Sequence, residues 1–296
     1  MAETLTIGSR GSALALWQSR AVAAMLEAAH PGLACAIEII KTTGDVRHDA
    51  SLMALAGKGA FTKEIEDAML DGRVDLAVHS LKDLPTTLPE GLALGAVTER
   101  EDPRDAFIGR PGVTSLAGLP SGGRVGTSSP RRRVQLLDLR PDLVLVDIRG
   151  NVDTRLRKVE ADGLDGIVLA CAGLRRLGLG DRISEAIGVD AMVPAVGQGA
   201  LGVEARAGDE RVLRIVSVLE HAATAAACAA ERAFLAELGG GCAVPIAAHA
   251  VVEGASLHMR AAVGRADGTV SRLAQSGEAA DPEGLGRELA GRLPRD

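Results

Sequence analysis

One cysteine stands in the most open stretch of backbone that this chain contains, "AELGGGCAVPI" at residues 236–246. Three consecutive glycines, Gly239 to Gly241, come directly before Cys242, and Pro245 follows it. Glycine allows a positive φ and leaves space around its neighbours. The pattern therefore predicts an exposed thiol and raises the question of what that thiol does.

A lysine and an aspartate form a second candidate for chemistry, in "VHSLKDLPTTLP". Lys82 and Asp83 follow an apolar strand pattern directly and come just before Pro85. An aspartate beside a proline is most often a turn former, so Asp83 alone is a weak indication of catalysis. We interpret His79, in the same stretch, as a packed side chain rather than an acid or base.

The stretch "VGTSSPRRRVQL" predicts a site for an anion. A strand leads into a helix with Ser129 as its N-cap and Pro130 at the first helical position, where a missing N–H costs nothing. Free N–H groups and the helix dipole favour a negative ligand at such a point. The alternative is an ordinary capped helix with solvated arginines. The side chains that would serve the anion are those of Thr127, Ser128, Ser129, Arg131 and Arg132.

"IRGNVDTRLRK" repeats this arrangement, with Arg149 at a strand end, Asn151 as N-cap and Arg155 one turn into the helix. Two anion sites at neighbouring strand ends indicate a ligand with several carboxylates or phosphates. The chain has 28 Arg against five Lys, and the planar fork of Arg suits such groups. Codon usage in a GC-rich genome explains the total equally well, but not the placement beside turns.

Two sequences that resemble nucleotide-binding motifs do not fit their requirements. "GQGALG" at 197–202 matches the glycine spacing of a dinucleotide fingerprint, but the residues after it favour a strand where that motif needs a helix. "AGKGAF" lacks the first glycine and the final Ser or Thr of a P-loop.

Strands and helices alternate over most of the chain, which predicts parallel sheets whose ligands bind at the carboxyl ends of strands. Ser12 is expected to cap the first helix, in which we expect an apolar face of Leu14, Trp17, Ala21 and Met25. After His221 one helix, three successive strands and a last helix predict a small α+β region. Strands are expected over 4–8, 36–40, 75–80, 92–97, 124–128, 143–150, 165–170, 200–207, 246–254, 257–264 and 270–277.

Composition limits the class of protein. A length of 296 residues indicates two or three domains, and 47% hydrophobic residues provide ample core. Three Phe, one Trp and no Tyr argue against nucleic-acid binding by base stacking. The four cysteines form no CxxC pair, so we expect no metal site and no disulfides. There is no signal-peptide pattern and no membrane-spanning run, so a cytoplasmic protein with no membrane partner is expected.

Taken together, these stretches resemble the porphobilinogen deaminase (hydroxymethylbilane synthase) family of tetrapyrrole biosynthesis. The matching blocks run in the family's order over nearly the whole chain, and the ordered set is highly specific. They are "IGSRGSALALWQ", "GKGAFTKEIE", "DLAVHSLKDLPT", "GTSSPRRRVQL", "IRGNVDTRLRK", "LACAGLRRLG", "PAVGQGALGVE" and "ERAFLAELGGGCAVPIAAHA".

The resemblance implies a fold of two α/β domains of the type II periplasmic-binding-protein kind, joined by paired hinges, with a small C-terminal α+β domain. We place domain 1 at 1–98 with 198–219, domain 2 at 99–197 and domain 3 at 220–296. The hinge segments would be Thr98 to Arg104 and Val193 to Gly199. The family is mostly monomeric, so a monomer is expected.

The resemblance also implies the reaction. Four porphobilinogen molecules would be condensed head to tail onto a dipyrromethane primer, releasing ammonia and then the linear tetrapyrrole hydroxymethylbilane. Cys242 would carry the primer through a thioether, which the flanking glycines leave room for. Asp83 matches the family's catalytic aspartate, which would stabilise the azafulvene cation left when ammonia departs.

Residues 41–60 would form a mobile cover over the cleft between the α/β domains. Ala54 and Ala60 depart from the family's pattern there and put the closure of this cover in doubt, whereas Pro130 in place of Leu suits its helix position. The positions that match cofactor- or substrate-binding residues are Arg10, Ser12, Lys58, Phe61, Ser80, Lys82, Thr127, Ser128, Ser129, Arg131, Arg132, Arg149, Gly150, Arg155, Arg176 and Gln198.

The competing hypothesis is a two-lobed solute-binding protein that captures an anion and does no chemistry. The absence of a signal-peptide pattern and the exposed Cys242 both argue against it, because a simple binder needs no such thiol.

Overall fold

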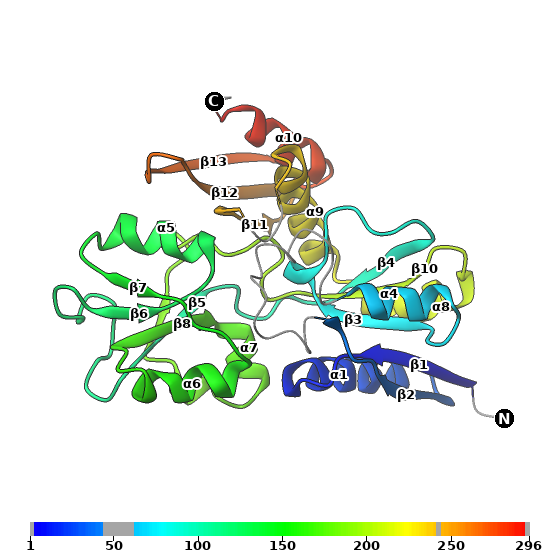
Figure 1. Ribbon diagram of the computed structural model, residues 1–296. Helices are drawn as coiled ribbons and strands as arrows, with labels where there is room; N and C mark the ends of the chain where they lie inside the picture. Colours follow the sequence, from blue (N-terminus) through cyan, green and yellow to red (C-terminus); the bar gives the residue numbers. More distant parts are fainter. Residues whose placement is uncertain (1–2, 44–61, 241–243, 294–296) are drawn as a thin grey trace. The chain divides into compact units, whose positions relative to one another are not determined.

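The computed structural model describes residues 3–43, 62–240 and 244–293, which form two compact units (Figure 1). Unit 1 comprises residues 1–100 and 200–226, and unit 2 comprises residues 101–199 and 227–296. The chain therefore passes from one unit to the other near residues 100, 199 and 226. The first two of these crossings lie in the segments expected to be hinges.

Unit 1 is built on a five-stranded sheet in the order β2-β1-β3-β10-β4. β1 pairs in parallel with β2 and β3, whereas β10 is antiparallel to both β3 and β4. Helices α1 and α8 pack on one face and α4 on the other. The elements are β1 (Glu3–Ser9), α1 (Ala13–Ala29), β2 (Leu33–Ile39), α4 (Lys63–Leu70), β3 (Leu76–Ser80), η1 (Leu81–Asp83), β4 (Leu92–Val97), β10 (Leu201–Arg206), α8 (Glu210–Val216) and η3 (Ser217–Leu219).

Unit 2 contains a second five-stranded sheet in the order β7-β6-β8-β5-β9. β6 is parallel to β7 and β8, and β5 is antiparallel to β8 and β9. Helix α5 covers one face, and α6 with α7 the other. The elements are β5 (Asp105–Gly109), β6 (Arg124–Gly126), α5 (Pro130–Leu139), β7 (Val144–Val146), α6 (Val152–Ala161), β8 (Gly166–Ala170), α7 (Cys171–Arg176), η2 (Gly180–Arg182) and β9 (Glu185–Ile187).

The two five-stranded sheets share one topology. Each has three parallel strands, with β1 between β2 and β3 in unit 1 and β6 between β7 and β8 in unit 2. In each, one antiparallel strand, β10 or β5, follows a point where the chain crosses between units. This confirms the predicted α/β fold class. The expectation of purely parallel sheets is wrong, because β10 and β5 run antiparallel to their neighbours. β5 and β9 were not predicted.

The C-terminal part of unit 2 carries the predicted separate antiparallel sheet, β11-β12-β13. Phe234, Leu285 and Leu289 from the two flanking helices fill its core. Ion pairs join it to the five-stranded part of unit 2, with Arg272 3.0 Å from Asp138. The elements are α9 (Ala222–Glu237), β11 (Ile246–Glu253), β12 (Ser256–Gly264), β13 (Val270–Glu278) and α10 (Pro282–Gly291).

The apolar face predicted for the first helix is wrong. Trp17 and Met25 are about 40% exposed, whereas polar Gln18 and Ser19 are buried with Val22. The reason is hydrogen bonding, because Gln18 Nε2 donates to Ser80 Oγ at 2.8 Å and Ser19 Oγ donates to Ser9 Oγ at 2.9 Å. Satisfied polar groups can therefore occupy the face that packs against the sheet.

Within the described residues, no single helix is long and apolar enough to cross a membrane. One pair, Glu210–Leu219 with Ala222–Glu237, reaches the threshold of length and composition only when taken together, across a bend of 106°.

Candidate functional site

In unit 1 the carboxyl ends of two neighbouring parallel strands, β1 and β3, carry predicted site residues. Arg10 follows β1, and Ser12 is the N-cap of α1, where its Oγ accepts from Ala15 N at 3.3 Å. The first helical turn after β1 is thus fixed by a side-chain cap, as the sequence predicted.

At the end of β3, Ser80 leads into the short helix η1, which contains Lys82 and Asp83. Leu81 is fully buried and its N donates to Ala200 O at 3.0 Å, so this turn is anchored to the strand segment beside it. Asp83 is exposed, and within the described part of the chain no hydrogen bond or ion pair occupies its carboxylate. An anchored backbone with an exposed acid is suited to present a fixed negative charge to a ligand.

In unit 2 the strands β7, β6 and β8 end side by side, and each is followed by a helix. Ser129 caps α5, accepting from Arg132 N at 3.4 Å. Ser128 Oγ joins two of these ends, because it donates to Ile148 O at 3.0 Å and accepts from Ile148 N at 2.9 Å. Thr127 is buried beside them. The hydroxyl groups predicted for the first anion site therefore lie at one edge of the sheet.

The second predicted anion site follows β7. Asn151 is the N-cap of α6, where its Oδ1 accepts from Thr154 N at 2.9 Å. Gly150 has φ +114°, a conformation that other residues rarely adopt, and its carbonyl accepts from Arg155 Nε at 2.7 Å. Arg149 precedes it, half-buried. Both helix starts therefore have the caps that the sequence predicted.

Arg131 and Arg132, which the sequence analysis expected to bind an anion, are not solvated as the alternative of an ordinary capped helix would have them. Both are buried and share the fully buried carboxylate of Asp105. Arg131 donates to Oδ2 at 2.7 Å and to Oδ1 at 3.1 Å, and Arg132 donates to Oδ1 through Nε at 3.0 Å and Nη2 at 2.8 Å. These two charges hold the pKa of Asp105 well below its ordinary value, although burial opposes them.

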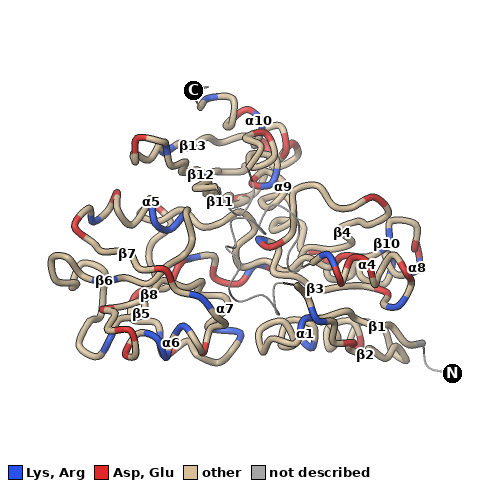
Figure 2. Tube along the Cα trace, viewed as in Figure 1, with Lys and Arg blue, Asp and Glu red and all other residues tan. Residues whose placement is uncertain are grey.

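Two further predicted residues are also held by the protein itself. Arg176, at the end of α7, is buried and its Nη2 donates to Gly199 O at 2.6 Å. Gln198 is buried, and its Nε2 donates to Pro103 O at 2.7 Å and to Asp105 Oδ1 at 3.1 Å. Figure 2 shows the basic residues of unit 2 along α5, α6 and α7, the helices that follow the three strand ends.

Three predicted site residues lie outside the described residues: Lys58, Phe61 and Cys242. The same is true of Ala54, Ala60 and most of the segment expected to cover the cleft.

Sequence reasoning missed a buried polar cluster on the α4 side of the unit 1 sheet. His79 Nε2 lies 3.1 Å from Glu204 Oε2, and both side chains are buried, with Glu66 of α4 close by. His79 is packed, as expected, but its acidic neighbours were not foreseen. Burial, with a smaller contribution from the charge of Glu204, raises the pKa of Glu66. Only the pairing of β10 with β3 could have revealed this cluster. In that pairing Glu204 lies opposite Ala77, two residues from His79 and on the same face of the sheet.

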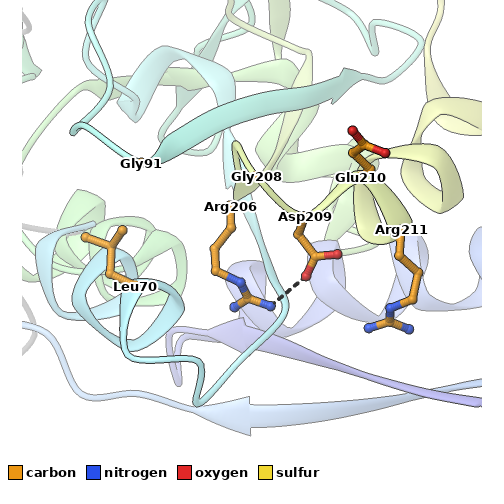
Figure 3. Close-up of a pocket in the computed structure, with 7 residues that line it drawn as sticks. All are labelled: Leu70, Gly91, Arg206, Gly208, Asp209, Glu210 and Arg211. Carbon is orange, nitrogen blue, oxygen red and sulfur yellow. Dashed lines mark hydrogen bonds and ion pairs between the residues drawn. The ribbon is translucent and has the colours of Figure 1, made fainter.

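A hollow on the surface of unit 1 contains none of the predicted site residues (Figure 3). Its lining includes Arg206, whose Nη2 donates to Asp209 at 2.9 Å, and Arg211. Among the described residues, no group of three or more His, Cys, Asp or Glu side chains could hold a metal ion.

Comparison with known proteins gives a consistent result over nearly the whole chain. Residues 5–214 match the family description "Porphobilinogen deaminase, dipyromethane cofactor binding domain", and residues 225–294 match "Porphobilinogen deaminase, C-terminal domain". Porphobilinogen deaminase from Roseiflexus castenholzii is 55% identical over 99% of this chain and 96% of its own length. The enzyme from Moorella thermoacetica is 55% identical over 98% of this chain and 92% of its own.

Solved structures that match are distant. The L-cystine solute receptor of Neisseria gonorrhoeae has a TM-score of 0.41 at 14% identity, covering 82% of this chain and 95% of its own. The probable amino-acid transporter binding protein YtmK of Bacillus subtilis has a TM-score of 0.43 at 8% identity, covering 74% and 90%. Scores at this level carry no argument about function.

The family models and the relatives that match define the class of this protein as a transferase of tetrapyrrole biosynthesis. The chain belongs to the porphobilinogen deaminase family. It is a transferase that condenses porphobilinogen into the linear tetrapyrrole hydroxymethylbilane, and it uses a dipyrromethane cofactor.

Proposed function

We propose that Cys242 holds the dipyrromethane cofactor through a thioether and that Asp83 is the catalytic aspartate, acting as an ionised carboxylate. The strand ends of unit 2 bind carboxylates of cofactor and substrate. The observation that carries this assignment is the meeting of three strand ends, β7, β6 and β8, each followed by a helix and by hydroxyl or guanidinium groups.

The chemistry of the substrate requires such a surface. Porphobilinogen has an acetate and a propionate, so every ring that is added brings two more negative charges. Charge-assisted hydrogen bonds from Arg to carboxylate are about twice as strong as neutral ones, and they offset the repulsion between those charges. Arg149, Arg155 and Arg176 supply guanidinium groups. The hydroxyl oxygens of Thr127 and Ser129 accept from backbone N–H groups, so their O–H groups can donate to a ligand, while Ser128 fixes the two strand ends.

The residues of unit 2 fit a cofactor that bears carboxylates. Asp105 neutralises only one of the two charges on Arg131 and Arg132, so this buried trio keeps a net charge of +1. A positive surplus in a region of low dielectric favours an anionic ligand over water. When bound, dipyrromethane supplies the pyrrole carbon to which the first porphobilinogen is joined.

In unit 1, Asp83 acts on the substrate itself. Departure of ammonia from porphobilinogen leaves a cation spread onto the pyrrole nitrogen. A fixed carboxylate that accepts a hydrogen bond from this N–H stabilises the charge where it develops. The buried Leu81 anchors the turn that presents Asp83, and Lys82, Ser80, Arg10 and Ser12 bind carboxylates beside it.

Several further properties belong to the same proposal. The chain acts as a monomer in the cytoplasm, with no nucleic-acid or membrane partner. Its domains are 1–98 with 198–219, 99–197 and 220–296, a division supported by the three separate sheets. Lys58, Phe61, Gly150 and Gln198 contribute to binding.

Intact-mass spectrometry of the purified chain tests the attachment. Protein from cells that make porphobilinogen is expected to carry the excess mass of one dipyrromethane, and Cys242→Ala is expected to lack it. Cys35→Ala, which changes the partly buried thiol of β2, serves as the matched control and should keep the excess mass. An unmodified wild-type chain, or a Cys242→Ala chain that retains the added mass, contradicts the proposal.

A further inference from the structure

We propose that Asp105 is a positioning residue: its carboxylate fixes Arg131 and Arg132 side by side so that their remaining N–H groups bind a carboxylate of cofactor or substrate. This inference rests on the proposed role of the two arginines. Asp105 is the first residue of β5, a strand that sequence analysis did not predict.

Two guanidinium groups in one buried place repel each other and need a shared counter-ion. Asp105 is fully buried, and both of its oxygens accept from Arg131, while Oδ1 also accepts from Arg132. The two cations are held close together, because both donate to the same oxygen, Asp105 Oδ1, and burial with the neighbouring charge of Arg131 lowers the pKa of Arg132. The carboxylate therefore stabilises a pair that would otherwise separate.

The backbone completes the orientation. Arg131 Nη1 also donates to Val193 O at 2.8 Å, and Arg132 Nη1 donates to Val168 O at 3.0 Å. Gln198, which precedes β10 in the chain, also donates from Nε2 to Asp105 Oδ1 at 3.1 Å. Each guanidinium group is thus fixed by a carboxylate and a carbonyl, which leaves little freedom to rotate.

The donors that remain are suited to a ligand. An Arg side chain has five N–H donors, and in the described part of the chain three hydrogen bonds are made by Arg131 and three by Arg132. Each therefore keeps two N–H groups, beside a net charge of +1. A single carboxylate that accepts from both forks would neutralise that charge.

Kinetics of the full-length, cofactor-bearing enzyme test this role with Asp105→Glu, which keeps the charge but lengthens the side chain. We expect KM for porphobilinogen to rise about tenfold with kcat changed by less than about threefold, because ground-state binding is lost. Mass spectra during turnover should show intermediates with one or two added rings accumulating. Asp105→Asn, which leaves two cations unpaired, should show the same pattern more strongly where it folds.

The matched control is Asp102→Asn. Asp102 also lies between two guanidinium groups, with Arg104 at 2.7 Å and Arg175 at 2.9 Å, but neither arginine is assigned to a ligand. It should lower the melting temperature and leave KM unchanged. The same result in Asp105→Glu, a lower melting temperature with wild-type KM, would mean that Asp105 is purely structural and overturns the proposal.

Arg132→Lys separates this inference from the function it rests on. A lysine keeps the charge but not the fork. If Arg132→Lys and Arg131→Lys both leave KM unchanged, the arginines do not bind a ligand and the assignment of the site fails. If they raise KM while Asp105→Glu does not, the site stands and the positioning role fails.

Discussion

The two five-stranded sheets of this protein share their strand order but differ in what their strand ends carry. In unit 1 the first residue of the antiparallel inner strand is Leu201, and in unit 2 the corresponding residue is Asp105. The strand ends of unit 1 present an exposed acid, Asp83, and those of unit 2 present arginines and hydroxyls. The shared topology gathers different side chains at equivalent strand ends, and in our proposal the acid of unit 1 serves the chemistry while the guanidinium groups of unit 2 serve binding.

The buried charges of the two units differ in the same way. The carboxylate of Asp105 accepts hydrogen bonds from two arginines and Gln198. In unit 1, His79 Nε2 lies 3.1 Å from Glu204 Oε2, but these atoms, Glu204 Oε1 and Glu66 Oε1 make no well-formed hydrogen bond among the described residues. Unit 2 thus has a satisfied network that can hold ligand-binding groups still, whereas the buried cluster of unit 1 is only partly satisfied.

The largest effect is expected in unit 1, where we assign the chemistry. Asp83→Asn keeps the shape of the side chain and removes the charge that stabilises the substrate cation, so kcat should fall by about 10²–10³. The melting temperature should stay at the wild-type value, since Asp83 is exposed. Glu90→Gln, another exposed acid of unit 1, is the control for general loss of charge. A kcat near wild type in Asp83→Asn would remove the chemistry from unit 1.

The next effect is expected in unit 2 and in KM. Arg155→Gln removes a guanidinium group that is held beside the second helix start by its bond to Gly150 O. A charge-assisted hydrogen bond contributes about 1.5–3 kcal/mol, so KM should rise roughly 10- to 100-fold with kcat little changed. Arg157→Gln, two residues along the same helix and exposed, should have wild-type kinetics. Equal effects of the two substitutions would show that only net charge matters.

The helix caps allow a direct test of the two units against each other. Ser12→Ala and Ser129→Ala each remove an N-cap hydrogen bond, with N···Oγ distances of 3.3 Å to Ala15 and 3.4 Å to Arg132. Each should lower stability by about 1 kcal/mol, or roughly 2–4 °C in melting temperature by calorimetry. A cap that could be removed with no loss of stability would not be needed to hold its helix start in place.

The smallest effect concerns Glu66 and pH. Because burial raises its pKa in the folded protein above the unfolded value of 4.5, the folded state binds more protons there, and stability from this group is lost as pH rises through the raised pKa. Glu66→Gln removes this dependence. The melting temperature of Glu66→Gln relative to that of the wild type should therefore rise as the pH is raised from 5 to 8. Glu90→Gln, which changes an exposed acid, is the control and should show no such trend, and a constant difference for Glu66→Gln would refute the account.

Local sequence was sufficient for features whose cause is local. The caps at Ser12, Ser129 and Asn151 were predicted from residue type and position, and each makes its expected hydrogen bond. The family, its fold class and its reaction followed from an ordered set of short blocks.

The rest depended on partners far away in the chain. The burial of Gln18 requires Ser80, which lies 62 residues later, and the pairing of Arg131 requires Asp105 on a strand that has no local signature. The cluster of Glu66, His79 and Glu204 needs α4 and two strands to be brought together. No pattern within one segment contains these facts.

The central claim is that the strand ends of unit 2 bind carboxylates through guanidinium groups such as that of Arg155, whereas the catalytic aspartate, Asp83, belongs to unit 1. A cycle of kinetic measurements that combines two enzyme variants with a porphobilinogen analogue, one of whose carboxylates is an ester, tests it most directly. If the ester replaces the carboxylate that Arg155 binds, Arg155→Gln should cause no further rise in KM for that analogue. Asp83→Asn should reduce kcat by the same factor with the analogue and with porphobilinogen. The claim would be contradicted if, for an ester at either position, the rise in KM caused by Arg155→Gln and the rise caused by the ester multiplied as independent effects.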